Sequence, residues 1–237
     1  MRKGTMASKA NGSERRLNKV KRQKEKVTRR NRLDADVRAK QILRGAISFF
    51  AEHGFSGQTR ELTNKLGVSK GLLYRYFPSK KILIDKVYEE VFLRRWNPRW
   101  ESILSDRSHS LVDRLKLFYL DYSKMLREYE WVRIYLYAGL ARASINQRYV
   151  KLVVERIYRR IIDEFRNEFG YPSVEKIKPT EPELEMIWNL HGSIFYIGVR
   201  KWVYYVDVPL DIDGAIERMV DGLYVNAKDV MRGALSR

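Results

Sequence analysis

Residues 46–80 read AISFFAEHGFSGQTRELTNKLGVSKGLLYRYFPSK, and this stretch decides the fold of the N-terminal part of the chain. From Asp34 onward, apolar residues recur at the spacing of an amphipathic helix. The helical pattern stops at Gly54, and the apolar Phe55 directly behind this glycine is typical of a Schellman helix end. The sequence therefore predicts a first helix that ends at Gly54.

Two shorter helices are predicted directly after the first one. Thr59 can cap the second helix, and Gly67 ends it. Ser69 can cap a third helix, which stops at Pro78 because proline cannot continue a helix. Two short helices joined by a tight turn at Gly67, Val68 and Ser69 predict a helix-turn-helix.

The outward face of the third helix is predicted to be short, basic and aromatic. In a helix-turn-helix the second of the two helices lies in the major groove, with its N-terminal residues nearest the base edges. Hydroxyl and ammonium groups nearby suit phosphate oxygens. A helical hairpin without DNA binding stays possible, and Tyr74 would then belong to the core. The outward residues are Lys70, Gly71, Leu72, Arg75 and Tyr76, and the candidate phosphate contacts are Thr59, Tyr74, Tyr76 and Lys80.

The ordered pattern resembles the DNA-binding domain of the tetracycline-repressor (TetR-type) family of transcriptional regulators, over about residues 35–95. The residues that carry the resemblance are Phe50, Gly54, Phe55, Thr59, Leu62, Gly67, Val68, Ser69, Leu73, Tyr74, Phe77, Ser79 and Lys80. This sequence departs from the family at Thr63, where alanine is usual, and at Tyr76, where histidine is frequent. The resemblance implies phosphate contacts from Thr59, Tyr74, Tyr76 and Lys80, and base or groove contacts from Ser69, Lys70, Gly71 and Leu72.

The charge of the chain favours a polyanionic partner. Its 237 residues include 47 Lys and Arg against 29 Asp and Glu, a formal net charge of +18. Residues 1–32 alone contain 13 of these cations and 2 acids, and they contain few large apolar residues. This segment is predicted to be a flexible basic arm that adds salt-dependent affinity for phosphates, unless it is only a solvated tail.

The remaining sequence is predicted to be helical throughout, because its apolar residues show no strand alternation. Two late segments, Leu184 to Tyr205 and Ile212 to Val230, repeat every 3.5 residues, a period that favours a partner helix. These two segments predict half of a four-helix bundle, and a second copy of the chain would supply the other half. The alternative is that both apolar faces are covered within one chain. The resemblance likewise implies a dimer built from the final two helices. The interface candidates are Leu184, Phe195, Trp202, Ile216, Met219 and Leu223.

Aromatic side chains are dense in the C-terminal part. They could line an apolar pocket with a few hydroxyl groups, although aromatic residues more often form plain core. Members of the family that the sequence resembles typically release DNA when a small-molecule effector binds this region. His191 could bond such a ligand or be a satisfied core residue. The ligand-binding candidates are Tyr119, Tyr122, Trp131, Tyr135, Phe165, Trp188, His191 and Phe195.

These patterns divide the chain into three predicted parts. They are a disordered basic arm at residues 1–33, a helix-turn-helix DNA-binding domain at residues 34–80, and a larger helical ligand-binding and dimerisation domain at residues 81–237. Residues 81–96 are expected to form the connecting helix. Because this helix leads from the DNA-binding domain into the core, it is the natural transmitter between them.

The sequence lacks the residues and motifs that are typical of several other classes of protein. It has no cysteine, which excludes disulfide scaffolds and thiolate metal sites and favours a cytoplasmic location. No apolar stretch approaches the ~20 residues of a membrane span, so no membrane partner is expected. Its three histidines show no metal-binding spacing, and no catalytic or nucleotide-binding motif occurs. We expect no metal, no cofactor and no enzymatic activity; an enzyme would need carboxylate chemistry hidden among the aromatic residues.

The leading hypothesis is a DNA-binding transcriptional regulator. It would be a repressor that binds a palindromic double-stranded DNA operator as a homodimer and leaves it when a small apolar or aromatic effector fills the C-terminal domain. The alternative is a ligand-independent architectural protein whose basic arm dominates DNA binding. Deletion of residues 1–32 separates the two, because only the regulator keeps its sequence preference without the arm.

Overall fold

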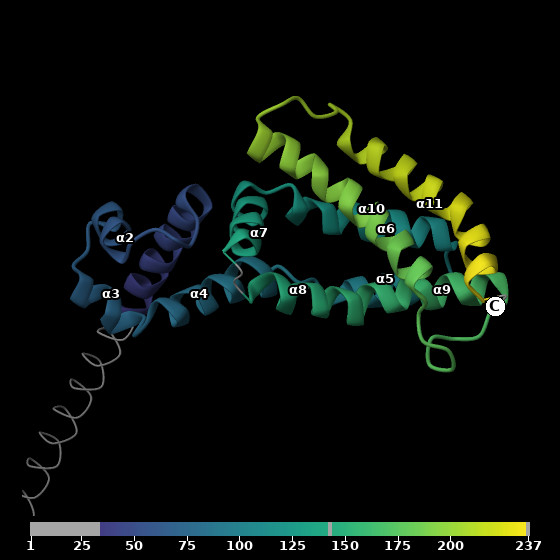
Figure 1. The fold of residues 1–237 in the computed structure, drawn as a ribbon, viewed down its shortest axis with the longest axis horizontal. Coiled ribbons are helices and arrows are strands. Elements are labelled where there is room, and N and C mark those ends of the chain that lie inside the picture. Colours follow the sequence, from purple (N-terminus) through teal and green to yellow (C-terminus); the bar gives the residue numbers. More distant parts are fainter. Residues whose placement is uncertain (1–33, 142–143, 236–237) are drawn as a thin grey trace, which may run out of the picture. The chain divides into compact units, whose positions relative to one another are not determined.

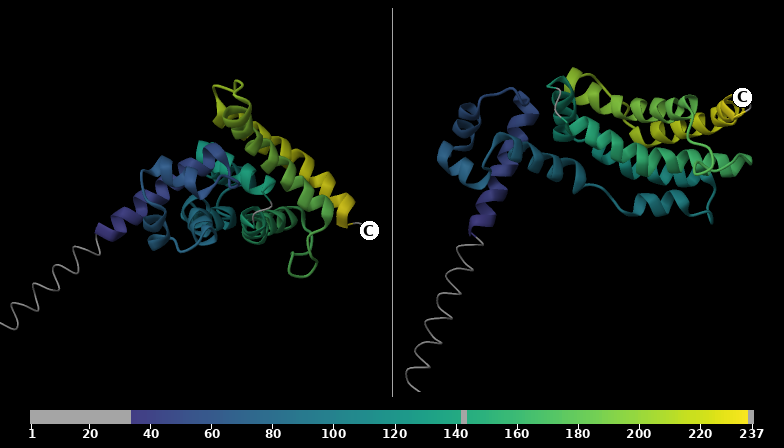
Figure 2. Two further views of the ribbon diagram at one scale, coloured as in Figure 1. Left: turned by 60° about the vertical axis from the view of Figure 1, so that its left-hand side comes forward. Right: turned by 60° about the horizontal axis from the view of Figure 1, so that its bottom comes forward.

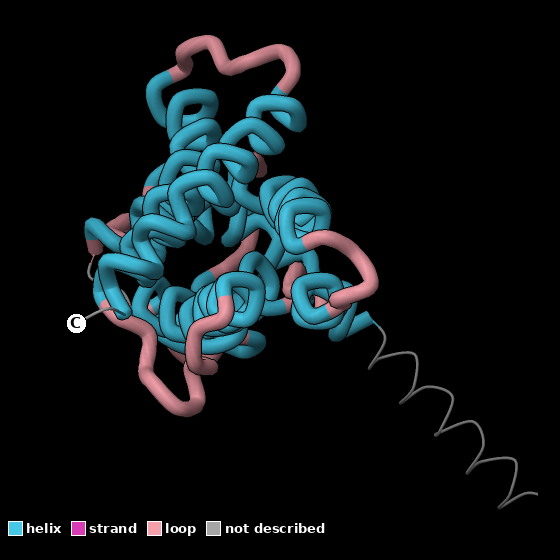
Figure 3. The backbone as a smooth tube through the Cα atoms, turned by 90° about the vertical axis from the view of Figure 1, so that its right-hand side faces the viewer, coloured by secondary structure: helices cyan, strands magenta, loops and turns pink. Residues whose placement is uncertain are grey.

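The computed structural model describes residues 34–141 and 144–235. Every regular element among these residues is a helix, as Figure 3 shows, and the predicted all-α class is confirmed. The expected basic arm at residues 1–33 lies outside the described residues. Residues 46–237 group into one compact unit, and all the contacts given below lie within this unit.

The first helices of the described chain begin and end through local capping chemistry. One helix covers residues 34–53, and it is followed by α2 (Thr59–Leu66), α3 (Lys70–Tyr76) and α4 (Lys80–Tyr88). Gly54 ends the first helix in the left-handed conformation (φ +73°), and its N–H donates to the Phe50 carbonyl at 2.9 Å. Thr59, expected to cap α2, is instead its first residue. Gln58 takes the cap position, with its backbone N–H donating to the Glu61 carboxylate at 3.2 Å.

The C-terminal part consists of longer helices, and some of them contain a π-helical turn. α4 continues through η1 (Glu89–Leu93), α8 (Ile145–Val153) continues through η2 (Val154–Tyr158) into α9 (Arg159–Phe169), and α10 (Glu181–Val199) continues through η3 (Arg200–Tyr204). The other helices are α5 (Arg99–Ser105), α6 (Leu111–Leu126), α7 (Tyr129–Leu140) and α11 (Ile212–Leu235). Figures 1 and 2 show α10 and α11 side by side, and both pack on α6. A π turn contains more residues than an α turn, so it changes which side chains face the core.

Helix α10 approaches the connection between α6 and α7 closely at Gly198. A Cβ atom on this glycine would overlap the Leu126 carbonyl oxygen and lie 2.8 Å from the Val132 side chain. Further along the same helix, the Trp202 indole N–H donates to the Arg127 carbonyl at 2.6 Å. The C-terminal half of α10 is therefore fixed to the end of α6, and only glycine allows this approach.

A buried ion pair fixes the start of α10. Arg166 of α9 and Glu183 are both fully buried, and two guanidinium nitrogens of Arg166 donate to the two carboxylate oxygens of Glu183, each at 2.7 Å. The same carboxylate accepts the N–H and the hydroxyl of Thr180, each also at 2.7 Å. Burial alone would raise the pKa of Glu183, but the bonds from Arg166 and Thr180 hold this pKa below its usual value. The loop after α9 and the first turn of α10 are thereby held together.

Candidate nucleic-acid interface and ligand pocket

The turn between α2 and α3 has the geometry of a helix-turn-helix. Gly67 lies in the left-handed region (φ +61°), and the N–H of Val68 donates to the Thr63 carbonyl at 3.1 Å. This pairing is that of a Schellman helix end. The hydroxyl of Ser69 then accepts the N–H of Leu72 at 3.1 Å and caps α3. The Ser69 hydroxyl oxygen already accepts a bond as the cap of α3. In a base contact this hydroxyl would therefore act as a donor.

Helix α3 has one buried face and one open face. Leu73 and Phe77 are buried, as is Leu62 of α2. The open face, called here the α3 face, contains exposed Lys70, Gly71 and Arg75 and half-exposed Leu72 and Tyr76. The structure therefore places all five residues predicted to face outward on a single accessible surface.

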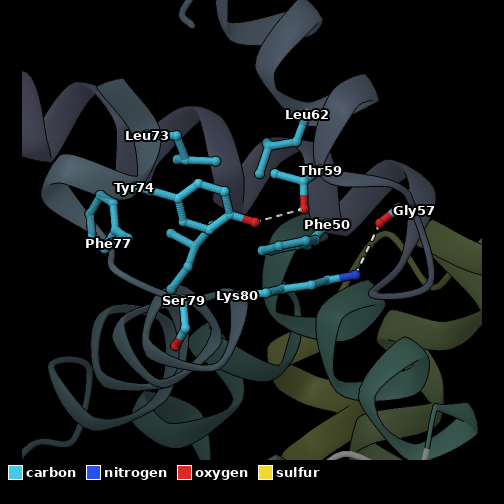
Figure 4. A pocket seen from close by; sticks show the side chains of 10 residues that line it. Phe50, Gly57, Thr59, Leu62, Leu73, Tyr74, Phe77, Ser79 and Lys80 are labelled. Atoms are coloured by element: carbon cyan, nitrogen blue, oxygen red, sulfur yellow. Dashed lines mark hydrogen bonds between the residues drawn. The ribbon is translucent and has the colours of Figure 1, made fainter. Parts of the chain in front are cut away.

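Of the other three candidate phosphate contacts, Thr59 lies on α2, and Tyr74 and Lys80 bond to the loop and helix that precede the turn. Figure 4 shows that the Tyr74 hydroxyl donates to the Thr59 hydroxyl at 3.5 Å, and that the Lys80 ammonium donates to the Gly57 carbonyl at 3.0 Å. An ammonium has three donors and a hydroxyl keeps spare capacity, so both groups can also bond a phosphate oxygen. These bonds restrict the side chains before any ligand arrives, which lowers the entropy lost on binding.

The electrostatics and shape of the α3 face suit a polyanion. No acidic residue occurs between Gly67 and Ile84, whereas this segment contains Lys70, Arg75, Lys80 and Lys81. A Cβ atom on Gly71 would meet only the Ser69 hydroxyl, at 3.9 Å, so the backbone is open to close approach here. Cations that neutralise phosphates release counterions, and this release supplies much of the affinity for DNA.

A cavity of about 70 Å³ lies among α7, the α8–η2 helix and α10. None of the described residues that line this cavity is charged. It is lined by Trp131, Tyr135, Tyr149, Val150, Val153, Tyr158, Trp188, His191, Gly192 and Phe195. This set, called here the aromatic cavity, includes five of the predicted ligand-binding residues, namely Trp131, Tyr135, Trp188, His191 and Phe195.

The other three predicted ligand-binding residues are not among the lining residues. Tyr119 and Tyr122 on α6 are fully buried in the core, and Phe165 on α9 stacks against Phe169 with ring centroids 6.0 Å apart. Tyr122 lies behind the wall of the cavity, where its hydroxyl shares a hydrogen bond of 2.8 Å with that of Tyr149. These residues support the cavity or the core around it and do not face it.

Sequence reasoning missed Tyr149 and Tyr158 as lining residues. Tyr149 belongs to the regular apolar series of α8, but nothing in that series shows which neighbour it faces. Tyr158 ends the π turn η2, and such a turn shifts the following residues around the helix relative to an uninterrupted α-helical pattern. The apolar series at four-residue spacing passes through Ile157 and leaves out Tyr158, so periodicity did not select this residue.

Two donors in the lining of the aromatic cavity lack a hydrogen-bond partner among the described residues, and the histidine in this lining has a lowered pKa. The indole N–H of Trp131 and the hydroxyl of Tyr158 are buried and have no hydrogen-bond partner within the described part of the chain. His191 is neutral near pH 7, because burial lowers its pKa to about 4. Its ring packs against those of Tyr122, Tyr158 and Trp188 at 5.2–6.0 Å. A buried donor without a partner costs free energy, and a ligand that accepts its hydrogen bond would remove this cost.

The aromatic cavity is in contact with the helix that begins at Lys80. Phe92, in the π turn that continues α4, is fully buried, and its ring centroid lies 5.2 Å from that of Trp131 and 5.3 Å from that of Tyr149. Both partners line the cavity. The Trp131 and Tyr149 rings are therefore in direct contact with the helix that begins at Lys80, a candidate phosphate contact. A movement of either ring would act directly on this helix.

Helix α7 forms a second connection, to the end of the first helix. Trp131 and Tyr135 line the cavity, whereas Arg133 between them donates to the Ala51 carbonyl at 2.6 Å and to the Trp202 carbonyl at 3.1 Å. A guanidinium at the C-terminal ends of helices is favoured by their dipoles. One short helix thus contacts the cavity and two helix ends at once.

The predicted interface residues on α10 and α11 do not share one outer surface. Ile216 is fully buried within the protomer, Leu223 is largely buried, and Phe195 lines the aromatic cavity. Leu184, Trp202 and Met219 are half-buried. A shallow groove of about 250 Å³, called here the outer groove, is lined by Met186, Asn189, Leu190, Ser193, Met219, Gly222, Leu223 and Asn226. Ile216 therefore packs inside its own chain, whereas the predicted interface residues Met219 and Leu223 line the outer groove.

The described residues contain no cluster of three or more His, Cys, Asp or Glu that could hold a metal ion. Among the same residues, none of the helices is both long enough and apolar enough to span a bilayer.

Comparison with known proteins identifies the class to which the helix-turn-helix belongs. Residues 42–87 match the family model for bacterial regulatory proteins of the tetR family. This match confirms the resemblance seen in the sequence, because residues 42–87 are similar to the DNA-binding segment of tetR family regulators. The chain is also similar to a solved structure of a TetR family protein from Vibrio parahaemolyticus, with 22% identity, a TM-score of 0.49, and coverage of 77% of this chain and 96% of that one. No curated protein matches the chain.

Proposed function

We propose that the protein is a ligand-responsive repressor that binds a palindromic operator as a homodimer and leaves it when a small molecule fills the aromatic cavity. The observation that carries this proposal is the α3 face, which is exposed, basic and free of acidic residues. Base or groove contacts would come from Ser69, Lys70, Gly71, Leu72 and Arg75, and phosphate contacts from Thr59, Tyr74, Tyr76 and Lys80.

The dimer would form through α10 and α11 along the outer groove. A single helix-turn-helix reads few base pairs, whereas a two-fold pair reads two half-sites in successive turns of the major groove. Gly222 and Ser193 in the groove are small and exposed, which permits close helix packing. In this proposal residues 34–80 bind DNA, and residues 81–237 bind the effector and the second copy.

The effector would act by holding the cavity in a form that does not suit DNA binding. An effector changes a two-state equilibrium only through its different affinities for the two states. Phe92 connects the cavity wall to α4, and Arg133 connects it to the end of the first helix. Movement of either contact would change the separation of the two α3 faces in the dimer.

The first experiment measures operator binding by gel shift, with the DNA upstream of the protein's own gene and a scrambled duplex at moderate salt. We expect the Lys70→Ala variant to lose about tenfold or more in affinity for the specific duplex. The matched control is Lys176→Ala, which removes the same charge from an exposed site in the loop before α10. Equal retention of specific and scrambled DNA by the unaltered protein would refute operator recognition.

The second experiment tests the dimer by sedimentation. A Cβ atom on Gly222 would meet no neighbouring atom within 4 Å in the described chain, so the Gly222→Arg variant is expected to fold. The new charge would lie in the outer groove and prevent a second copy from packing there. A Gly222→Arg protein that stays dimeric with a normal circular dichroism spectrum would place the interface elsewhere.

A further inference from the structure

We infer that the aromatic cavity takes an uncharged, planar aromatic molecule that carries a hydrogen-bond acceptor, such as an aryl ketone. The inference rests on the proposed function only in treating this molecule as the effector. The cavity itself, its lining and its polar atoms are described independently of any DNA contact.

The absence of charge in the lining excludes ionic ligands as the preferred class. None of the lining residues in the described chain is Lys, Arg, Asp or Glu. His191 is the one titratable base in this lining, and burial keeps its ring neutral near pH 7. A carboxylate or ammonium group would therefore leave water without gaining an opposite charge, which is costly.

The polar atoms define what an uncharged ligand must offer. An indole N–H is a donor only, so the Trp131 N–H can be satisfied only by an acceptor. The Tyr158 hydroxyl is buried like that N–H, and neither has a partner among the described residues. Both groups are donors that an acceptor on the ligand would satisfy, whereas a hydrocarbon would leave them without a bond.

The walls favour a flat ring. Trp131 and Tyr135 stack nearly parallel, with an interplanar angle of 10° and centroids 5.1 Å apart. Phe195 meets both of them edge-on at 72° and 73°. A planar aromatic ring can extend this arrangement by stacking or by edge contact, which an aliphatic group cannot do.

The size of the cavity sets the scale of the ligand and a requirement for its entry. Its volume of about 70 Å³ is smaller than the ~150 Å³ of an engineered apolar cavity that binds benzene. A single substituted ring therefore enters only when the walls move apart. The exposed lining residue Gly192, where an added Cβ would meet no atom of the described chain within 4 Å, marks the side open to solvent. Opening on binding is what would give the ligand different affinities for the two forms of the protein.

A lipophilic cation is the principal competing occupant, because aromatic faces attract cations. It would gain from the faces of the rings, but it offers no acceptor to the Trp131 N–H or to the Tyr158 hydroxyl. The two classes therefore differ in a measurable way, since only the acceptor ligand depends on these two donors.

The test uses the full chain and four probes of similar size, with binding measured by calorimetry. The probes are acetophenone, isopropylbenzene, benzoate and phenyltrimethylammonium, which share a phenyl ring and differ in the attached group. We expect acetophenone to bind about tenfold more tightly than each of the other three, which corresponds to about one hydrogen bond. Tightest binding of benzoate or phenyltrimethylammonium would overturn the inference, and so would equal or undetectable binding of acetophenone and isopropylbenzene.

Two matched variants test the donors. Tyr158→Phe removes a hydroxyl that has no partner in the described chain, whereas Tyr149→Phe removes one that is bonded to Tyr122. We expect Tyr158→Phe to reduce the preference for acetophenone over isopropylbenzene by about threefold or more, with the unfolding temperature of the free protein unchanged or raised. Tyr149→Phe should keep the preference and lower the unfolding temperature. Trp131→Phe removes the other donor and should also weaken the preference, and full preference in both Tyr158→Phe and Trp131→Phe would contradict the inference.

The failure of this inference can be told apart from the failure of the proposed function. Release of the operator duplex is measured separately, by gel shift in the presence of each probe. Release by a charged probe that binds the aromatic cavity would support the function and refute the ligand class. Preferential binding of acetophenone without any release of DNA would support the ligand class and refute its role as effector.

Discussion

The charged groups of the α3 face are exposed to water, whereas two donors of the aromatic cavity are buried. On the α3 face the charged side chains of Lys70 and Arg75 are exposed, so water satisfies them before DNA arrives. In the cavity the Trp131 N–H and the Tyr158 hydroxyl are buried without a partner in the described part of the chain. The α3 face is therefore ready for a ligand at no cost to the free protein, while the aromatic cavity carries a free-energy cost that its ligand would remove.

A buried polar group elsewhere in the fold gives the sharpest test of this contrast. Arg166→Met removes the partner of Glu183 and leaves a carboxylate fully buried without its guanidinium. We expect a loss of about 3–5 kcal/mol in the free energy of unfolding, measured by urea denaturation. The double variant Arg166→Met with Glu183→Leu should recover most of this loss. A loss below about 1 kcal/mol in the single variant would show that the two bonds from Thr180 satisfy the buried carboxylate without the guanidinium.

The second prediction concerns pH and the cavity alone. The pKa of His191 is lowered by burial to about 4, so the unfolded chain binds a proton below about pH 6.5 that the folded chain does not bind. The free energy of unfolding should therefore fall as the pH falls, by about 2 kcal/mol between pH 6.5 and pH 5. Carboxylates such as Glu183, with lowered pKa values, contribute their loss at lower pH. His191→Phe should flatten the pH dependence in this window, and an unchanged profile would refute the assignment.

The third prediction separates two glycines on either side of the Ser69 cap. Gly67→Ala forces alanine into the left-handed region and should cost about 1 kcal/mol of stability. Gly71→Ala adds a methyl group in open space, so stability should stay the same or rise, while affinity for the operator falls. Thermal unfolding and gel shift on both variants check this. Normal operator affinity in Gly71→Ala would show that DNA does not approach the backbone at this residue.

The smallest predicted effect concerns a single phosphate contact. Lys80→Met should weaken DNA binding only a few-fold and reduce the slope of log affinity against log salt concentration by about 1. Lys176→Met removes the same charge from the exposed loop before α10 and should leave the slope unchanged. The readout is fluorescence anisotropy on the operator duplex across a salt series. Parallel slopes in Lys80→Met and the unaltered protein would remove Lys80 from the interface.

The two regions also differ in how far the sequence predicts them. Gly54, Gly67 and Ser69 terminate or cap helices through bonds to residues within one turn, so local chemistry was enough to place them. The one local error, Thr59 in place of Gln58 as the cap of α2, is a shift of a single residue. The aromatic cavity instead depends on which side chains from α7, α8 and α10 meet in space, and local chemistry does not determine this.

The errors in the cavity and at α11 have identifiable physical causes. Tyr119, Tyr122 and Phe165 are aromatic residues of the kind that line ligand sites, but they are fully buried in the core. Tyr158 was missed because it is not a member of the four-residue apolar series Tyr149, Val153, Ile157 and Ile161, although it is equally buried. Ile216 keeps the spacing of a partner-facing residue, yet it is fully buried within its own chain. Apolar spacing identifies a buried face but does not say which element covers it.

Helix α7 limits how the specificity of this protein could be redesigned. Its positions 131 and 135 shape the cavity, while Arg133 between them holds the carbonyls of Ala51 and Trp202. An engineer who seeks a biosensor for a new compound can vary the two aromatic positions. Any design that replaces the arginine would remove its bond to the last turn of the first helix, and any design that rotates α7 would also displace Tyr137, whose hydroxyl donates to the Glu52 carbonyl at 3.3 Å. Libraries for altered recognition should therefore keep Arg133 fixed and place most of their diversity on α8 and α10.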